Sequence, residues 1–376
     1  MNIALLGHGV VGSGVTSILK EEKLTDLAVS KILVARKESI KDDRFTLDFE
    51  EIINDENIDV IVECMGGIEP AHSYVKQAIE AGKHVISANK KMLANHMELF
   101  ELAKDKGVKL LVEASCGGGI PCISNLQRIA RNDPILSFEG ILNGTSNFIL
   151  SSIFEKDLGF KEALKKAQEL GYAEQDPSDD IKGYDVCYKS VILSYFALSK
   201  IIDPKDVFTL GIDTLSDEDI AYAGKNQKTI KLIGRAGYEN DRFYIYVMPH
   251  FVDERSLFGS VDSNYNVFQS SSKYLGKASF IGQGAGSYPT GHSIVQDLLD
   301  LQQKKYTEER PASRELIENE REGIFYIRCR DHSFDELKEE MITTDSFLTR
   351  KCSLRKIQEC MKKCEDKEMF IGEMDL

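Results

Sequence analysis

The first third of the chain alternates between short apolar runs and longer segments in which apolar residues recur every three or four positions. The apolar runs predict strands at residues 2–6, 28–35, 59–64, 84–87 and 109–114. The segments between them predict helices at residues 15–22, 71–81 and 92–106. Strands separated by helices are typical of a parallel sheet covered on both faces, so we predict an α/β domain over residues 1–115.

The pattern changes after residue 115, where helices and strands no longer alternate. Helices are predicted at residues 122–131, 147–154, 160–170, 184–198 and 292–302, and strands at 135–142, 242–247 and 279–281. This mixture predicts an α+β domain over residues 116–291. A polar linker follows at 304–322. The C-terminal module at 323–376 has the order strand, helix, strand, helix, strand, at residues 324–329, 334–341, 347–350, 354–364 and 369–371.

Composition narrows the class of protein. The net charge of −14 argues against nucleic acid as a partner, because nucleic-acid-binding proteins neutralise phosphates with an excess of cations. No stretch approaches the roughly 20 apolar residues of a membrane helix, and the N-terminus has no basic region or cleavage site of a signal peptide. Eight cysteines are too sparse for a disulfide scaffold. We therefore expect a cytoplasmic protein with reduced thiols.

A glycine-rich turn joins the first predicted strand to the first helix. Gly7, Gly9 and Gly12 form the pattern G-x-G-x-x-G, with Val10 and Val11 before the last glycine. Between a strand and a helix, this pattern gives a tight turn and places a pyrophosphate at the helix N-terminus. We predict dinucleotide binding here; the alternative is a glycine turn that only connects packed elements.

The end of the second predicted strand indicates which dinucleotide binds. An NAD site places an acid there for the ribose hydroxyls. This chain has Arg36 and Lys37, and two cations suit the 2′-phosphate of NADP. NADP is therefore favoured, while the neighbouring Glu38 leaves NAD possible.

An acidic segment at residues 171–189 precedes the apolar part of a predicted helix. Its carboxylates are Glu174, Asp176, Asp179, Asp180 and Asp185, and its last residue is Lys189. Asp185 and Lys189 are four residues apart, so on a helix they share a face and the carboxylate can hold the ammonium. Such a pair can carry a proton to a substrate oxygen. The alternative is a solvated acidic loop, in which Asp179 and Asp180 cap the helix that follows.

Seven blocks of the chain resemble the homoserine dehydrogenase family, in the family's order over about residues 1–303. The segment at 171–189 is the most specific of them. The other blocks are Gly7-His-Gly-Val-Val-Gly-Ser-Gly14, Val62-Glu-Cys-Met-Gly-Gly67, Gly82-Lys-His-Val-Ile-Ser-Ala-Asn-Lys-Lys91, Glu113-Ala-Ser-Cys-Gly-Gly-Gly-Ile-Pro121, Asn143-Gly-Thr-Ser-Asn147 and Gly284-Ala-Gly-Ser-Tyr-Pro-Thr290.

The resemblance implies an enzyme that reversibly reduces L-aspartate 4-semialdehyde to L-homoserine with NAD(P)H, in threonine and methionine biosynthesis. It also implies a doubly wound Rossmann nucleotide-binding domain, completed by a returning helix at 292–303, and a catalytic and dimerisation domain. A homodimer, possibly extended to a tetramer, is the implied assembly.

Carried over by position, Lys189 resembles the general acid/base, and Asp185 the carboxylate that orients this lysine and the substrate. Glu174 matches the residue that binds the substrate's amino group. Lys90 is similar to a lysine that contacts both nicotinamide and substrate, although it could instead only cap its helix. In the turn at 143–147, a Thr or Ser hydroxyl is predicted to cap the helix that follows.

Two further sets of positions follow from the resemblance. Gly171 and Gly286 match backbone positions near the nicotinamide. A monovalent-cation site, usually for sodium, is built from main-chain carbonyls at Glu113, Cys116, Gly118 and Ile120. Hard oxygen ligands without a His–Cys pair also exclude zinc at this position. The alternative for Glu113 is a carboxylate that pairs with a nearby backbone N–H.

The C-terminal module departs from the family pattern. Many members end in an ACT domain that senses threonine, with an Asp-x-Pro-Gly turn after its first strand. Here that place has the residues Arg330-Asp-His-Ser-Phe334, so we predict a shortened, degenerate ACT-like module and do not expect threonine inhibition. Cys352, Cys360 and Cys364 are expected to serve packing or, alternatively, redox cross-linking between subunits.

Two other functions are alternatives to the dehydrogenase. One is an aldehyde dehydrogenase that uses Cys116 as a nucleophile; it requires an activating base, and no histidine is close in sequence. The other is a non-enzymatic NADP-sensing regulatory protein, in which the lysine and carboxylates of 171–189 would be dispensable.

Overall fold

The computed structural model describes residues 1–156, 158–307 and 311–375. Residues 308–310 of the predicted linker and residue 376 of the predicted C-terminal module lie outside the described residues. The described chain divides into two compact units, one formed by Met1–Arg131 with Gly282–Pro311 and the other by Asn132–Ile281 with Ala312–Leu376. No helix in the described part of the chain is both long enough and apolar enough to cross a membrane.

The first unit is built on a parallel sheet. Within the described residues its strands are β1 (Asn2–Leu6), β2 (Ala28–Leu33), β3 (Phe45–Thr46), β4 (Val60–Glu63), β5 (His84–Ser87) and β6 (Leu110–Leu111). They lie in the order β3-β2-β1-β4-β5-β6, and each neighbouring pair is parallel. This order reverses at β1 and β4, which is the arrangement of a doubly wound dinucleotide-binding fold. The predicted Rossmann fold is confirmed.

Helices cover this sheet, and its strands are therefore buried on both faces. All four residues of β4, for example, are buried. The helices are α1 (Val10–Glu21), α2 (Glu50–Ile53), α3 (Ala71–Glu80), α4 (Lys90–Asn95), α5 (Glu98–Lys106), α6 (Cys122–Ala130) and α12 (Ser287–Gln303). Apolar residues of α1 and α12 share one core with the strands, including Val15, Ile294 and Leu298. Helix α12 packs against α1, where a Cβ on Gly14 would collide with the carbonyl of Ser287.

The second unit is built on a large mixed sheet. In the described residues its strands are β7 (Ile135–Ile141), β9 (Phe208–Thr209), β10 (Lys228–Glu239), β11 (Arg242–Asp253), β12 (Tyr265–Ser272), β13 (Gly276–Gln283), β16 (Phe325–Arg328), β17 (Lys338–Met341), β18 (Ser346–Thr349) and β20 (Phe370–Met374). Their order is β13-β12-β7-β10-β11-β20-β16-β18-β17, with β9 beside β11. Two small strand pairs accompany it, β8 (Lys200–Ile201) with β14 (Ser313–Arg314) and β15 (Glu322–Gly323) with β19 (Cys352–Ser353).

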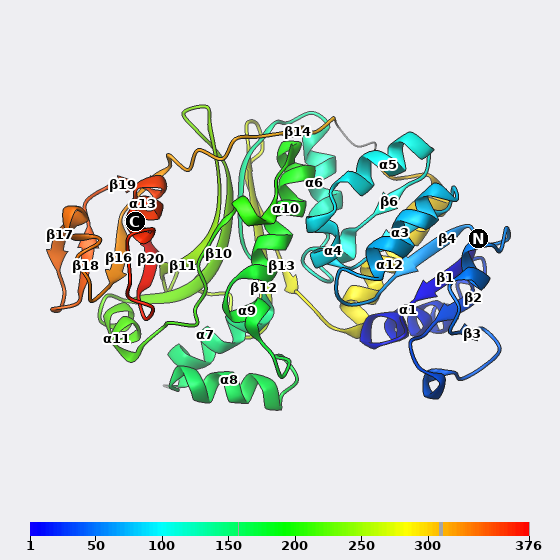
Figure 1. Ribbon diagram of the computed structural model, residues 1–376, viewed down its shortest axis with the longest axis horizontal. Helices are drawn as coiled ribbons and strands as arrows, with labels where there is room; N and C mark the ends of the chain where they lie inside the picture. The colour runs from blue at the N-terminus through cyan, green and yellow to red at the C-terminus, as the bar shows by residue number, and fades with distance from the viewer. Residues whose placement is uncertain (157, 308–310, 376) are drawn as a thin grey trace. The chain divides into compact units, whose positions relative to one another are not determined.

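The helices of the second unit are α7 (Gly144–Lys156), α8 (Phe160–Glu169), α9 (Ser178–Ile181), α10 (Tyr184–Leu198), α11 (Asp217–Lys225) and α13 (Leu354–Met361). Short 3₁₀ helices occur in both units, at Lys37–Ser39 and Glu113–Ser115 in the first and at Pro204–Asp206 and Asp335–Leu337 in the second. Helix α10 packs against β10 and β7 (Figure 1). Almost every one of its side chains is buried. Gly234 of β10 permits this close packing, because a Cβ there would lie 2.9 Å from Val186.

The C-terminal segment joins the sheet of the second unit instead of forming a separate body. Strand β20 pairs with β11, and Glu373 of β20 accepts a hydrogen bond from the Tyr246 hydroxyl at 2.6 Å. The helix predicted at 334–341 is wrong: a single 3₁₀ turn leads into β17, which pairs with β18. The unit boundaries also lie elsewhere than the predicted domain limits, since α6 belongs to the first unit and residues 323–375 to the second.

Candidate active site

The proton-transfer pair predicted from the acidic segment forms on α10. Lys189 and Asp185 lie one helical turn apart, and their side chains are 8% and 5% exposed. The Lys189 ammonium donates to Asp185 Oδ2 at 2.7 Å and to the Leu142 carbonyl at 2.6 Å. Burying an ammonium is costly unless a carboxylate and hydrogen-bond acceptors accompany it. The apolar helix therefore holds the lysine–carboxylate pair in a fixed orientation.

A residue to which the sequence assigned no role completes this group. Asn143 precedes α7, and its Oδ1 accepts a hydrogen bond from the Ser146 N–H at 2.7 Å, so Asn143 and not the predicted hydroxyl caps the helix. Its amide group donates to Asp185 Oδ2 at 2.8 Å and to Asp180 Oδ1 at 2.7 Å. Asn143 thus fixes Asp185 while it caps α7. The sequence signal for it was the turn at 143–147 that it begins.

The remaining predicted residues of the acidic segment lie between α8 and α10, with Asp179 and Asp180 in the short helix α9. Gly171 ends α8 with φ of +77°, a conformation that favours glycine. Glu174 is exposed, and its carbonyl accepts a hydrogen bond from the Gln168 side chain at 3.2 Å. Neither Asp179 nor Asp180 caps α10. The N-cap of this helix is Gly183, and no side chain caps it.

The glycine-rich turn of the first unit has the geometry of a phosphate-binding loop. Gly7 has φ of +96°, and a Cβ there would lie 2.9 Å from the Cys64 carbonyl, while a Cβ on Gly12 would collide with the Gly7 carbonyl. Gly9 is different, since a Cβ there would meet no atom within 4 Å. Two glycines therefore close the turn, and the third leaves open space at the N-terminus of α1, where a pyrophosphate fits. Val10 is exposed and Val11 partly buried beside this space.

The predicted 2′-phosphate residues, Arg36 and Lys37, follow β2 and are exposed. A pocket of about 310 Å³ adjoins the phosphate loop and is lined by His8, Thr16, Ser17, Lys20, Lys41, Asp42, Arg44 and Phe45. Arg44 holds the pKa of the Asp42 carboxyl at about 2, so this carboxylate stays ionised and paired. Burial and the nearby cations lower the pKa of His8. Lys41 and Arg44 are cations near the phosphate loop that the sequence pattern did not single out.

Lys90 begins α4, whose N-cap is Asn89. The Asn89 Oδ1 accepts a hydrogen bond from the Met92 N–H at 3.1 Å, so Lys90 is not the cap. A cation in the first turn is unfavourable for the helix dipole, and both Lys90 and Lys91 lie there. Asn89 is itself held by hydrogen bonds to the Gly67 carbonyl and the buried Glu63.

Glu63 ends β4 in the interior of the first unit. Its carboxyl group accepts hydrogen bonds from the Met65 N–H at 2.7 Å and from the Ser87 hydroxyl at 2.5 Å. Burial raises the pKa of this carboxyl to about 7, because the hydrogen-bond donors offset only part of the lost hydration. Glu63 therefore positions the loop after β4 and, through Asn89, the start of α4.

We expect Glu63→Gln to remove a pH-dependent loss of stability. An unfolded glutamate ionises near about pH 4.3, whereas folded Glu63 keeps its proton up to about pH 7, so the free energy of unfolding falls as pH rises through this window. The full loss is roughly 3–4 kcal/mol above pH 7. Glutamine mimics the protonated carboxyl, since its oxygen can accept from Met65 and its amide can donate to Ser87.

Urea unfolding from about pH 5 to about pH 8 measures this effect. The difference in unfolding free energy should grow with pH in favour of the variant. The exposed residue Glu80 offers the control substitution Glu80→Gln, which should leave the pH profile unchanged. A difference between Glu63→Gln and wild type that is constant across pH would contradict the expectation.

The turn predicted to bind a monovalent cation is compact and buried. Gly117 and Gly118 have φ of +77° and +58°, and a Cβ on Gly118 would lie 2.5 Å from the Gly284 carbonyl. The carbonyls of this turn are hard oxygen ligands, the type that Na⁺ prefers, so the residues fit such an ion. The Glu113 carboxylate accepts hydrogen bonds from the N–H groups of Ile123 and Ser124 at 2.9 and 2.7 Å, as in the alternative considered for it. Its main-chain carbonyl is a different group, so these contacts of the carboxylate do not conflict with the predicted cation role.

Cys116, Ile120 and Gly286 complete the predicted positions. Cys116 is fully buried, and its thiol accepts a hydrogen bond from the Ser115 hydroxyl at 3.6 Å. A nucleophilic thiol needs access to substrate and a base, and this environment provides no access. The Ile120 carbonyl accepts from the Cys122 N–H at 2.7 Å. Gly286, with φ of +129°, is the N-cap of α12.

Comparisons with known proteins agree with this arrangement. Two family models match the chain, one described as homoserine dehydrogenase, NAD binding domain, over residues 7–113, and one described as homoserine dehydrogenase over residues 121–299. The homoserine dehydrogenase of Lactococcus lactis is 37% identical over 316 residues, which are 80% of this chain and 74% of that protein.

Solved structures extend the similarity to the whole chain. A homoserine dehydrogenase from Thiobacillus denitrificans has a TM-score of 0.88 at 30% identity and covers 100% of this chain and 98% of its own. The S. aureus homoserine dehydrogenase at pH 7.5 has a TM-score of 0.77 at 33% identity, with the same coverage. Together with the phosphate-binding loop and the buried lysine–carboxylate pair, these matches show that the chain belongs to the homoserine dehydrogenase family of NAD(P)-dependent oxidoreductases.

Proposed function

We propose that Lys189 is the general acid/base in reversible hydride transfer between NAD(P)H and L-aspartate 4-semialdehyde, which gives L-homoserine. The observation that supports this most directly is the buried pair of Lys189 and Asp185 on α10. The ammonium is held by the Leu142 carbonyl and by the Asp185 carboxylate, which Asn143 anchors, so it has one fixed orientation, as proton transfer requires.

When bound, the reduced nicotinamide supplies a hydride to the carbonyl carbon of the aldehyde. The carbonyl oxygen then gains negative charge and needs a proton, which the Lys189 ammonium donates. In the oxidation direction the neutral Lys189 amine takes the proton of the homoserine hydroxyl. Asp185 stabilises the ammonium on both occasions and keeps its N–H groups oriented. Asn143 acts as a positioning residue through Asp185.

The substrate's amino group requires carboxylates, and Asp185 and the exposed Glu174 of the acidic segment are proposed to bind it. Lys90 is proposed to contact both substrate and nicotinamide, with Gly171 and Gly286 close to the nicotinamide. Lys90 is the first residue of α4 and follows Asn89, which the buried Glu63 holds in place.

NADP is proposed as the preferred cofactor because Arg36 and Lys37 are exposed at the end of β2. The first unit would hold the pyrophosphate at the open space beside Gly9.

We further propose Na⁺ at the main-chain carbonyls of Glu113, Cys116, Gly118 and Ile120. Burial raises the pKa of the neighbouring carboxyls of Glu113 and Asp297, and a bound cation would favour their ionised forms. A homodimer and a place in threonine and methionine biosynthesis complete the proposal.

The double variant Arg36→Ala, Lys37→Ala is expected to raise the KM for NADP⁺ by about 10–100-fold, since it removes charge-assisted contacts to the 2′-phosphate. The KM for NAD⁺ should change little, because NAD⁺ lacks that phosphate. Initial rates with each cofactor measure this. Lys76→Ala, which replaces an exposed lysine of α3 in the same unit, is the control. Equal effects on both cofactors would contradict a role in 2′-phosphate binding.

The decisive assay for the function follows nicotinamide reduction by the purified chain with L-homoserine and NADP⁺ or NAD⁺. Oxidation of L-homoserine that does not require phosphate or coenzyme A supports the proposal. Turnover that consumes either compound and is abolished by thiol alkylation would instead support an aldehyde dehydrogenase that depends on Cys116. Absence of turnover together with tight NADP binding would favour a sensing protein.

A further inference from the structure

Two short motifs of the same form meet in the C-terminal segment. Cys329-Arg-Asp331 follows β16, and Cys364-Glu-Asp366 lies between α13 and β20. Strands β16 and β20 are antiparallel neighbours in which Arg328 is opposite Phe370. The end of one strand and the approach to the other therefore lie together, although the motifs are far apart in sequence.

The cysteine and aspartate side chains converge in one place. The Cys329 and Cys364 Sγ atoms are 3.5 Å apart, and Asp331 Oδ1 lies 3.4 Å from the Cys329 Sγ. Ligands at about 2.3 Å for sulfur and about 2.1 Å for oxygen around a tetrahedral Zn²⁺ lie about 3.8 Å apart for two thiolates and about 3.6 Å apart for a thiolate and a carboxylate. Packing alone can bring two sulfur atoms this close, but here the Cys329 thiol also donates a hydrogen bond to Asp331 Oδ1, which places a carboxylate oxygen beside the same sulfur.

The Asp331 carboxylate is fixed before any ion binds. Its Oδ1 accepts a hydrogen bond from the Ser333 N–H at 2.8 Å, and its Oδ2 accepts from the Glu365 N–H at 2.7 Å. A similar hydrogen bond runs in the opposite direction between the two loops: Asp366 Oδ2 accepts from the Arg330 N–H at 2.8 Å. The two loops are thus held together by the outer hydrogen bonds that metal ligands usually have.

We propose that Cys329, Cys364 and Asp331 form a binding site for a thiolate-preferring divalent cation, of which Zn²⁺ is the best match. Two sulfur ligands and one carboxylate favour Zn²⁺ over Mg²⁺ or Ca²⁺, which require oxygen ligands. Cys329 is buried, whereas Cys364 is partly exposed, so an ion can enter from the Cys364 side and keep a water molecule as its fourth ligand. The bound ion would tie the end of β16 to the loop before β20.

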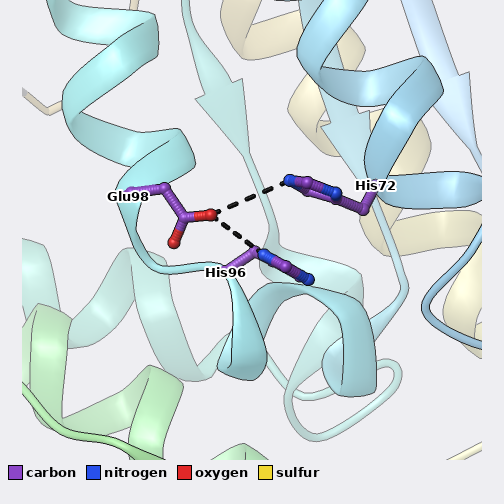
Figure 2. A group of neighbouring side chains, drawn as sticks. All are labelled: His72, His96 and Glu98. Carbon is purple, nitrogen blue, oxygen red and sulfur yellow. Dashed lines mark hydrogen bonds and ion pairs between the residues drawn. The ribbon is translucent and has the colours of Figure 1, made fainter.

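A second group of potential ligands, in the first unit, has a different geometry. His72, His96 and Glu98 lie close together, with ring nitrogens of both histidines directed at the Glu98 carboxylate (Figure 2). The imidazole rings are stacked, however, with centroids 3.7 Å apart and planes at 13°. Lone pairs of imidazole nitrogens lie in the ring plane, so two parallel rings do not direct them at one ion. This group is better described as histidines that share a carboxylate.

Titration of the reduced full-length chain with Co²⁺ tests the site, because thiolate ligands give sulfur-to-cobalt charge-transfer bands. We expect these bands to saturate at one Co²⁺ per chain and to disappear on addition of Zn²⁺. Cys364→Ser should weaken binding by at least about tenfold. Cys352→Ser, which removes another buried thiol of the same segment, should bind Co²⁺ as wild type does.

Thermal unfolding provides a second measurement. Zn²⁺ should raise the Tm of wild type and of Cys352→Ser but not that of Cys364→Ser, because a ligand stabilises only the state that binds it. Absence of thiolate bands in the reduced wild-type chain would overturn the proposal whether or not the variants fold. Bands unaffected by Cys364→Ser would also overturn it. A Cys329–Cys364 disulfide that forms in air while the reduced chain binds no Co²⁺ would show that the pair is a redox element instead.

Discussion

Lys189→Met is expected to lower kcat for L-homoserine oxidation by about 10²–10⁴-fold, the usual contribution of a general acid/base. Methionine keeps the apolar stem of the side chain but cannot accept the hydroxyl proton. The KM for NADP⁺ should change little, because the variant alters none of the residues proposed to hold the pyrophosphate and the 2′-phosphate. Steady-state rates at saturating cofactor measure the effect.

A matched control for this variant is Lys165, a lysine of α8 in the same unit whose side chain is 77% exposed. Lys165→Met should keep kcat within about twofold of wild type, because a substitution on the exposed surface has a small effect. Circular dichroism and cofactor binding establish whether Lys189→Met is folded. Wild-type turnover by folded Lys189→Met would show that another group transfers the proton.

Asp185→Asn is expected to cost about 3–5 kcal/mol of folding stability, because it leaves the buried Lys189 ammonium without its carboxylate. Asparagine keeps the shape of the side chain, and its oxygen can still accept from Asn143. The loss therefore reports the missing charge and not a cavity. Urea unfolding at neutral pH measures it, and activity should fall as well, because Lys189 loses the group that orients it.

A double-mutant cycle separates the structural role of this pair from its chemical role. The double variant Asp185→Asn, Lys189→Met contains neither buried charge, so its loss of stability should be smaller than the sum of the two single losses by about 1–3 kcal/mol. Its turnover should nevertheless stay as low as that of Lys189→Met. Additive stability losses would mean that the two side chains do not interact in solution.

The C-terminal segment shows where local sequence is insufficient. Residues 338–341, Lys-Glu-Glu-Met, have good helix propensity, and the pattern predicted a helix there. In the structure these residues form β17 and pair with β18. Strand formation depends on a partner that is available only in the folded chain, so tertiary pairing overrides a weak local preference.

The active-site group shows the same limit at the level of single side chains. The spacing of Asp185 and Lys189 was enough to predict their contact, because a helix brings residues four apart onto one face. The role of Asn143 was missed because its contact with Asp185 joins residues 42 positions apart. The buried Glu63 was missed for a related reason, since only the packing around β4 shows that its carboxyl group is desolvated.

The sequence by itself determined the alternation of strands and helices, the glycine-rich loop, the lysine–carboxylate pair and, through its motifs, the family. These features depend on short-range periodicity and spacing, which are visible in the sequence itself. Only the tertiary structure decided the anchoring of Asp185 by Asn143, the strand at 338–341 and the meeting of Cys329 with Cys364. Each of these depends on contacts between distant parts of the chain, whose geometry is set by how sheets and helices pack and not by any local pattern.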